Sequence, residues 1–289
     1  MKKEPWLTSP KATADIVKKY DFKFRKSFGQ NFLIDANAVK KIVDAADIKD
    51  DDVVLEIGPG IGTLTQHLAY NAGKVIAVEI DERLIPVLEE TLADYDNVEL
   101  INEDVLKLNL DELLAKNRGT GRVKVIANLP YYVTTPIVMA LLERSECIES
   151  ITIMVQKEVA QRMNAAAGTK DYGALTLAVQ YFSDTQKVTD VSPNCFMPRP
   201  DVTSTVIQLN VKKERQQMND EKLMFRVIRA AFGQRRKTLI NSLKNSDIAI
   251  SKEQWESILA DAGIDSGVRG EKLTLEDFAR LSDEVGKYL

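Results

Sequence analysis

Four apolar segments of this chain end in a glycine or a polar residue at a nearly constant interval, and this interval restricts the fold most. The ends are Gly58, Glu79, Asp104 and Asn128, which are 79 − 58 = 21, 104 − 79 = 25 and 128 − 104 = 24 residues apart. Each interval has room for one strand and one helix, the repeat of a parallel α/β sheet. Because carboxyl ends of parallel strands share one edge, we expect these residues to meet there, where ligands of such sheets bind.

Three glycines follow the first apolar strand in the sequence VVLEIGPGIGTL, residues 53–64. Gly58, Gly60 and Gly62 allow a sharp turn and a close approach of the backbone to a ligand. The pattern is GxGxG, which differs from the dinucleotide-binding fingerprint GxGxxG. Glu79 stands at the distance along the chain at which a carboxylate meets ribose hydroxyls, and Asp104 is expected to accept from an adenine amino group. These residues predict a nucleoside-containing ligand; a glycine-rich turn without a ligand is the alternative.

The sequence NLPYY, residues 128–132, closes the fourth strand with an amide, a proline and aromatic rings. An adenine amino group is a weak nucleophile because its lone pair is delocalised, and two acceptors aimed at its hydrogens would favour a pyramidal nitrogen. We predict that the Asn128 side-chain oxygen is one acceptor and the carbonyl of Leu129 or Pro130 is the other. Tyr131 would stack on the base, as aromatic side chains do with unpaired nucleobases. A strand end followed by a proline turn is the alternative.

The motifs EIGPGIGTLT, VEID, NEDVL and NLPYY stand in the order and spacing of S-adenosylmethionine-dependent methyltransferases that act on adenine N6. Residues 28–35, FGQNFLID, resemble the cofactor-capping motif of the ribosomal RNA adenine N6,N6-dimethyltransferase family. Three later segments, FMPRPDVTS, RAAFGQRRKTLINSL and RGEKLTLEDFARL, are similar to that family's later signatures. The first four motifs are shared with antibiotic-resistance methyltransferases of large-subunit RNA, whereas the last two favour the small-subunit enzymes.

This resemblance implies dimethylation of N6 on two adjacent adenines in the 3′-terminal hairpin loop of small-subunit 16S ribosomal RNA, as part of ribosome biogenesis. It implies S-adenosyl-L-methionine as the cofactor, S-adenosyl-L-homocysteine as the product, and no metal. The expected catalytic residues are Asn128, Leu129, Pro130 and Tyr131. The expected cofactor-binding residues are Asn31, Leu33, Gly58, Gly60, Glu79, Asp104 and Asn128. Tyr131 and Phe196 are the candidates for stacking on the target base, with a plain core position as the alternative for Phe196.

The predicted fold is α/β, a Rossmann-like class I methyltransferase sheet that is mostly parallel, with seven strands of which the last is antiparallel, followed by a small all-helical domain. Strands are expected near residues 53–57, 75–80, 98–102, 123–128, 150–156, 188–191 and 203–211. Helices are expected at 221–232, 235–244, 252–262 and 274–286. The predicted domains are a basic N-terminal arm (1–27), a cofactor-binding catalytic domain (28–212) and a helical RNA-binding domain (213–289).

Basic residues are concentrated in two segments although the formal net charge is −4. Residues 1–41 contain ten Lys/Arg against four Asp/Glu, and residues 212–245 contain ten against three. The sequence QRRK follows an apolar helical pattern, so we expect it on a helix, where Arg235, Arg236 and Lys237 would contact RNA phosphates. A solvated helix face is the alternative.

Cysteine spacing and the length of the apolar runs indicate where the protein is expected to be located. The two cysteines, Cys147 and Cys195, have neither disulfide nor zinc spacing, and no apolar run is long enough for a membrane. We therefore expect a cytoplasmic protein without a membrane partner. The family resemblance implies small-subunit ribosomal RNA, within an assembling 30S particle, as the partner, and we expect a monomer. The competing functions are a large-subunit adenine N6-methyltransferase, a non-catalytic RNA-binding assembly factor, and a small-molecule methyltransferase or NAD enzyme on the same sheet.

Overall fold

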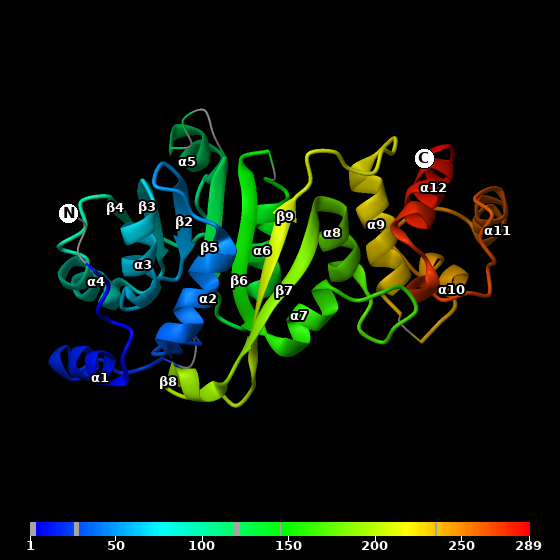
Figure 1. Ribbon diagram of the computed structural model, residues 1–289. Coiled ribbons are helices and arrows are strands. Elements are labelled where there is room, and N and C mark those ends of the chain that lie inside the picture. The colour runs from blue at the N-terminus through cyan, green and yellow to red at the C-terminus, as the bar shows by residue number, and fades with distance from the viewer. Residues whose placement is uncertain (1–3, 26–28, 118, 120–121, 145, 235) are drawn as a thin grey trace. The chain divides into compact units, whose positions relative to one another are not determined.

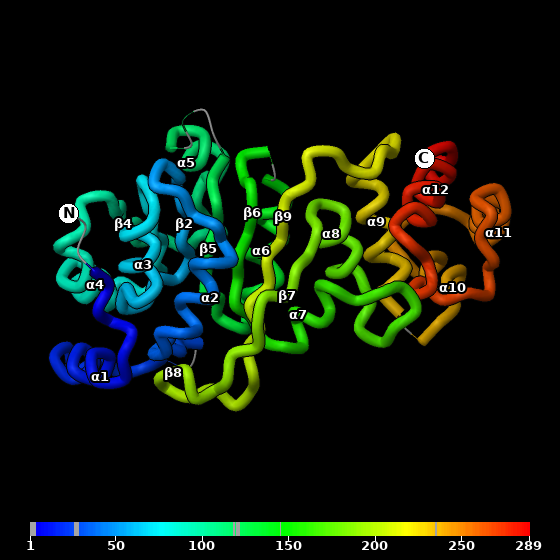
Figure 2. Tube along the Cα trace, viewed as in Figure 1, coloured from blue at the N-terminus to red at the C-terminus, as the bar shows by residue number. Residues whose placement is uncertain are grey.

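The computed structural model describes residues 4–25, 29–117, 119, 122–144, 146–234 and 236–289. It divides into two compact units. The sheet unit comprises Met1–Ala160 and Asp184–Val211, and the helical unit comprises Gln161–Ser183 and Lys212–Leu289. The tube in Figure 2 follows the chain as it leaves the sheet unit, forms the green helical segment and returns along a long strand. Within the described ranges, no helix is long and apolar enough to cross a membrane.

The sheet unit is built on seven strands in the order β4-β3-β2-β5-β6-β9-β7 (Figure 1). Neighbours from β4 to β6 pair in parallel, and β9 is antiparallel to β6. The strands are β2 Val53–Ile57, β3 Lys74–Glu79, β4 Val98–Asn102, β5 Val123–Asn128, β6 Ile148–Gln156, β7 Ser183–Val191 and β9 Ser204–Val211. The prediction of a mostly parallel sheet of seven strands with an antiparallel strand is confirmed.

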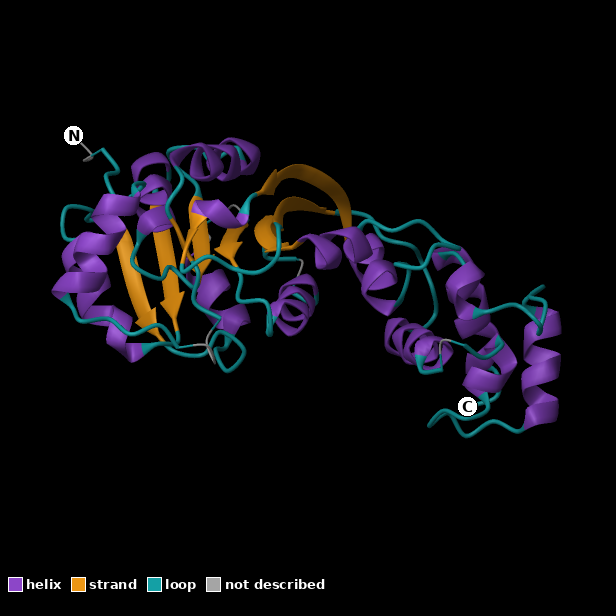
Figure 3. Ribbon diagram, turned by 90° about the horizontal axis from the view of Figure 1, so that it is seen from below, coloured by secondary structure: helices purple, strands orange, loops and turns teal. Residues whose placement is uncertain are grey.

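Helices flank the strands of this sheet (Figure 3). Strands that are covered on both faces have nearly continuous apolar sequences. β2 and β5 are strands of this kind, and all but one residue of each is buried. The helices are α1 Pro10–Lys19, α2 Ala36–Ala46, α3 Thr63–Asn71, α4 Ile85–Thr91, α5 Leu110–Asn117 and α6 Thr134–Leu142, with short 3₁₀ turns η2 Glu82–Leu84 and η3 Pro193–Cys195. A separate two-stranded antiparallel sheet joins β1 Phe32–Leu33 to β8 Phe196–Met197.

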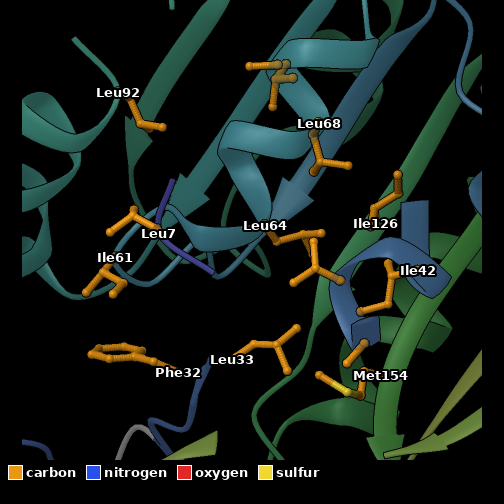
Figure 4. Close-up of a cluster of buried hydrophobic side chains, with 14 of the residues drawn as sticks. Leu7, Phe32, Leu33, Ile42, Ile61, Leu64, Leu68, Leu92, Ile126 and Met154 are labelled. Atoms are coloured by element: carbon orange, nitrogen blue, oxygen red, sulfur yellow. The ribbon is translucent and has the colours of Figure 1, made fainter. Parts of the chain in front are cut away.

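The segment before β1 packs into the sheet unit instead of forming a separate arm. Leu7 is fully buried in the cluster drawn in Figure 4, and its N–H donates to the Gln66 side chain at 3.2 Å. Ser9 caps α1 by accepting from the Ala12 N–H. The structure differs here from the predicted basic arm, because the apolar residues at Leu7 and Ile16 supply enough buried surface to hold this basic segment against the sheet unit.

The helical unit also differs from the prediction at its boundary. It includes residues 161–183, which end at the first residue of β7, together with everything beyond residue 211. Phe182 is buried and stacks on Phe225 at 5.8 Å between ring centroids, which explains why residues 161–183 belong to this unit. Its helices are α8 Ala174–Phe182, α9 Glu221–Phe232, α10 Leu239–Leu243, α11 Lys252–Asp261 and α12 Leu275–Gly286, with η4 Gly270–Lys272; α7 Lys157–Met163 crosses the division.

Candidate active site at the carboxyl edge of the sheet

A cavity of about 330 Å³ lies in the sheet unit where β2, β3 and β5 end. All four residues that end the predicted strands, Gly58, Glu79, Asp104 and Asn128, line it. The structure therefore brings together the polar groups that the regular spacing predicts at one edge. The other contributors come from residues 29–33, 56–64, 78–84, 103–106 and 128–137.

The glycine turn after β2 forms one wall of the cavity. Gly58 and Gly60 have φ of 71° and 63°, values that side chains other than glycine rarely adopt. A Cβ atom at Gly60 would lie 3.1 Å from the Phe32 ring, so this position also needs glycine for space. The turn thus keeps its backbone free of side chains on the side where Phe32 and the cavity lie.

Glu79 ties the end of β3 to this turn. Its Oε2 accepts from the Gly60 N–H at 3.2 Å, and its Oε1 accepts from the Asp81 N–H at 2.9 Å. The side chain is 5% exposed, and burial raises the pKa of Glu79 to about 7. Asp81 in turn accepts from the Gln30 side chain at 2.7 Å, which fastens the segment before β1 to the β3 end.

Glu56 is a second buried acid of the cavity that the sequence analysis missed. It precedes the glycine turn on β2, is 1% exposed, and burial raises its pKa to about 8. Its Oε2 and the Oγ1 of Thr63, another residue of the cavity wall, are buried without a partner among the described residues. Buried polar atoms are rarely left unpaired, so these oxygens suit a ligand that brings hydrogen-bond donors. The signal in the sequence was a lone acid in the otherwise apolar run VVLEI.

Asn128 uses only the nitrogen of its side-chain amide within the protein. Its Nδ2 donates to the carbonyl of Asn31 at 3.1 Å, and the structure gives Oδ1 no partner among the described residues. Because the nitrogen is held by a carbonyl, the assignment of the oxygen as the free atom follows from the hydrogen bond. This is the acceptor that the mechanism predicted from NLPYY requires.

The two main-chain carbonyls considered as the second acceptor differ in whether they already accept hydrogen bonds within the protein. The Pro130 carbonyl already accepts from the Val133 N–H at 3.2 Å and the Thr134 hydroxyl at 3.1 Å. The structure gives the Leu129 carbonyl no comparable partner among the described residues. Leu129 is itself fixed by its N–H, which donates to the Met154 carbonyl of β6 at 3.1 Å. The Leu129 carbonyl is therefore the better candidate.

The aromatic residues divide into wall and core. Tyr131 lines the cavity, is half-buried, and its hydroxyl lies 2.8 Å from the Ser204 Oγ. Tyr132, which the sequence analysis did not single out, also lines the cavity and is 59% exposed. Phe196 is only 4% exposed, pairs with Leu33 across β1 and β8, and is not part of the cavity wall. Its burial favours the alternative, a core position, and its stacking on the base stays a prediction.

The segment before α2 closes one side of the cavity. Asn31 and Leu33, the two predicted cofactor-binding residues of this segment, both line it, and Leu33 is 3% exposed. Asn31 contributes its carbonyl to Asn128 and its own side-chain N–H to the Gly29 carbonyl at 3.0 Å. Phe28, the first residue of the motif FGQNFLID, lies outside the described residues.

The predicted RNA-binding residues belong to the helical unit. Arg236 and Lys237 are exposed and lie in the turn between α9 and α10, so the predicted helix over 235–244 is wrong at its start. Arg235 lies outside the described residues. In the part of the chain that the structure describes, no group of three or more His, Cys, Asp or Glu side chains is placed to hold a metal ion.

Comparison with known proteins decides the family. The model of the family described as ribosomal RNA adenine dimethylase matches residues 21–287. The chain belongs to this family. A ribosomal RNA small subunit methyltransferase A of Lachnoclostridium phytofermentans is 53% identical, over 97% of this chain and 98% of the relative. The protein of the same name from Clostridioides difficile is 50% identical, over 96% of each chain.

Solved structures agree with membership of the ribosomal RNA adenine dimethylase family. A dimethyladenosine transferase from Plasmodium falciparum is similar with a TM-score of 0.70 and 27% identity, covering 86% of this chain and 95% of that one. The 23S rRNA methyltransferase ErmE is similar with a TM-score of 0.64, also at 27% identity, covering 89% and 100%. A dimethyladenosine transferase and a 23S rRNA methyltransferase are thus both similar to this chain in architecture, whereas the relatives at about half identity carry the small-subunit name.

Proposed function

We propose that this enzyme transfers methyl groups from S-adenosyl-L-methionine to N6 of two adjacent adenines in the 3′-terminal hairpin loop of 16S ribosomal RNA, two methyl groups to each. The proposal rests on the side-chain amide of Asn128, of which only the nitrogen makes a hydrogen bond among the described residues. Its nitrogen is held by the Asn31 carbonyl, and its oxygen stands in a cavity whose other polar groups suit a nucleoside. Family membership supplies the substrate class.

The cavity wall fits S-adenosyl-L-methionine in four places. The Glu79 carboxylate would accept from ribose hydroxyls, and the Asp104 side chain, which lines the same wall, would accept from the adenine amino group. The unpartnered oxygens of Glu56 and Thr63 would accept from an ammonium group. Ile80 is 45% exposed and also lines the cavity, an apolar surface that suits the face of a base. The bound cofactor supplies an electrophilic methyl carbon on a positively charged sulfur, and its product is S-adenosyl-L-homocysteine.

The residues of NLPYY would hold the target amine. Asn128 Oδ1 and the Leu129 carbonyl would accept from the two N6 hydrogens, and the lone pair would then be localised on the nitrogen and directed away from both. Tyr131 would stack on the base, with its ring held through the Ser204 hydrogen bond. Orientation carries this step: no strong base is needed, because attack on a sulfonium methyl leaves a proton that solvent can accept. Extruding a loop base costs on the order of a few kcal/mol.

The test combines a deletion strain with an Asn128→Ala variant. Mass spectrometry of 16S RNA from the deletion strain should show unmethylated adenines at the two positions, and the wild-type gene should restore both dimethyladenosines. Asn128→Ala should lower turnover by roughly 10² to 10³, the loss expected for one preorganised polar contact. Binding of S-adenosyl-L-homocysteine, followed by thermal shift, should persist. Wild-type turnover in the variant would remove Asn128 from the mechanism.

The same experiment separates the competing functions. A large-subunit enzyme would restore methylation in 23S RNA instead of 16S RNA, an outcome that the likeness to ErmE makes worth measuring. A non-catalytic assembly factor would restore ribosome assembly with Asn128→Ala as fully as with wild type. Recognition of an assembling 30S particle, a monomeric state and a cytoplasmic location remain predictions, which subunit-binding and sedimentation measurements would examine.

A further inference from the structure

Two lysines of the sheet unit share one carboxylate oxygen on its outermost strand. The Nζ atoms of Lys157 and Lys187 lie 3.1 Å and 2.9 Å from Oδ2 of Asp190. The other oxygen of Asp190 accepts from the Thr205 hydroxyl at 2.7 Å. The hydrogen bond from Thr205 lowers the pKa of Asp190 most, and the hydrogen bond from Lys187 is the next largest cause, so this pKa lies below its usual range. Asp190 is therefore ionised at neutral pH, and it gathers two ammonium groups at one point.

The cluster carries more positive charge than this carboxylate balances. A further lysine, Lys41, binds the hydroxyl of Thr189 at 3.2 Å, and the structure gives it no bond to Asp190 among the described residues. The side chains of Lys157 and Lys187 are 46% and 52% exposed, and Lys41 is exposed as well. The nearby acid Glu158 is exposed, and the structure gives it no bond to these lysines among the described residues. Two ammonium groups against one bonded carboxylate leave a net positive charge and donors available to a second anion.

The lysine cluster (Lys157 and Lys187) lies close along the chain to the residue that supports Tyr131. The Lys157 N–H donates to the Thr203 carbonyl at 3.0 Å. The following residue, Ser204, holds the Tyr131 hydroxyl at 2.8 Å, and the residue after it, Thr205, is the hydroxyl donor within the cluster. Ser204 and Thr205 are consecutive residues of β9, so the supports of the aromatic ring and of the cluster are adjacent in the strand, with their side chains on opposite faces of the sheet.

We propose that the lysine cluster binds a backbone phosphate of the RNA strand beside the target adenine. The inference rests on the proposed function, since Tyr131 marks where the base would sit. A base drawn out of its loop brings its flanking phosphates with it, and clustered ammonium groups favour phosphate over a neutral surface. Asp190 keeps the lysines together in the free enzyme and competes with the incoming phosphate. This site belongs to the sheet unit and is separate from Arg236 and Lys237 of the helical unit.

The test uses two variants with opposite expected signs. Lys157→Gln with Lys187→Gln should weaken binding to a 16S 3′-terminal hairpin RNA and flatten the salt dependence of log K by up to about 1.4, or about 0.7 for each lost contact on single-stranded RNA. Asp190→Asn keeps a partner for Thr205 but removes the competing charge. It should tighten RNA binding and steepen the salt dependence. Fluorescence anisotropy of labelled RNA measures both without requiring methyl transfer.

A matched control removes the same charge elsewhere in the sheet unit. Lys19 and Lys49 are each 58% exposed and each pair with one carboxylate, Glu90 and Asp47. Lys19→Gln with Lys49→Gln should change the salt dependence much less than the double variant of the cluster. Retained binding of S-adenosyl-L-homocysteine shows that every variant is folded, and Lys187→Gln alone provides a milder substitution.

The proposal is overturned by equal effects of cluster and control variants, by no change in either, or by weaker RNA binding by Asp190→Asn. An effect seen with intact 30S particles but absent with the hairpin RNA would also overturn it, because the contact would then lie elsewhere on the particle. Failure of the proposed function looks different, since wild-type enzyme would then bind RNA yet leave the adenines unmethylated.

Discussion

Glu56 and Glu79 are carboxyl groups that the fold withdraws from water in the wall of one cavity. Burial raises their pKa values to about 8 and about 7. Desolvation penalises the charged form, so both bind a proton more tightly in the folded protein than in the unfolded chain. Without a bound ligand, Glu56 is accordingly protonated below about pH 7 and acquires its charge only near pH 8.

This shift predicts how stability depends on pH at the residue scale. Because the folded state binds the proton more tightly, the contribution of Glu56 is fully present below its unfolded pKa of about 4.5. It is lost as the pH rises to about 8, a change on the order of a few kcal/mol. Denaturant unfolding from pH 5 to 8 should therefore show a smaller decline for Glu56→Gln than for wild type. Glu103→Gln, at an exposed acid of the same edge, is the control; equal declines in all three proteins would contradict the assignment.

Single residues also show what the sequence could and could not indicate. NLPYY predicted an amide and a carbonyl at the strand end, but only the bonds to Val133 and Thr134 distinguish the Leu129 carbonyl from that of Pro130. Phe196 was a candidate for stacking because it precedes a proline turn. Its burial depends on pairing between β1 and β8, more than 160 residues apart, which local sequence does not contain.

At the scale of elements, the parallel strands were the most predictable part. β2 and β5 were found at their observed bounds because both faces are buried and their sequences are apolar throughout. β7 begins at Ser183, five residues before the predicted start, because residues 183–187 read SDTQK and carry no apolar signal. Pairing with β9 defines that part of the strand.

The turn between α9 and α10 is the element that the sequence misassigned. QRRK was predicted to lie on a helix over residues 235–244, because it follows the apolar pattern of α9. The predicted end of α9 at Phe232 is confirmed, but the next helix begins only at Leu239. The Gly233 N–H bonds to the Ala230 carbonyl, a shorter repeat than that of an α-helix, as the last turn tightens. Arg236 and Lys237 are thereby presented from a turn, where both are exposed.

If these two residues contact phosphates, their removal has a measurable signature. Arg236→Gln with Lys237→Gln should lower affinity for 30S particles and flatten the salt dependence by up to about 1.4. Lys222→Gln with Lys244→Gln removes two exposed lysines from the same unit and is the control. Similar salt slopes in wild type and both double variants would assign Arg236 and Lys237 to solubility alone.

At the scale of the whole molecule, the helical unit is discontinuous in sequence. The chain passes from one unit to the other after residues 160, 183 and 211. Tyr181 and Phe182 of α8 pack against Phe225 of α9, with ring centroids 5.4 and 5.8 Å away. A domain boundary drawn from the linker near residue 212 therefore separates helices that share one core.

A fragment of residues 1–212 should for this reason be less stable than the full chain. It keeps α8 but loses its partners, so we expect exposed apolar surface, a lowered Tm and increased binding of an anilinonaphthalene dye. A second fragment in which a Gly/Ser linker also replaces residues 161–183 should bind less dye, because the exposed helix is then removed. A 1–212 fragment with the Tm of the full chain and no dye binding would show that α8 is stable alone.

Because α8 and α9 share one core but are separated in sequence, α8 is synthesised before the helix that covers it. The last residue of α8 is translated 232 − 182 = 50 residues before the last residue of α9. At about 5 to 20 residues per second, α9 is completed about 3 to 10 s after α8, so the aromatic side chains of α8 lack their partner for that time. The strands before and after α8 in the chain can already pair during this interval. Nascent chains stalled within that interval should be the ones that chaperones recognise most strongly.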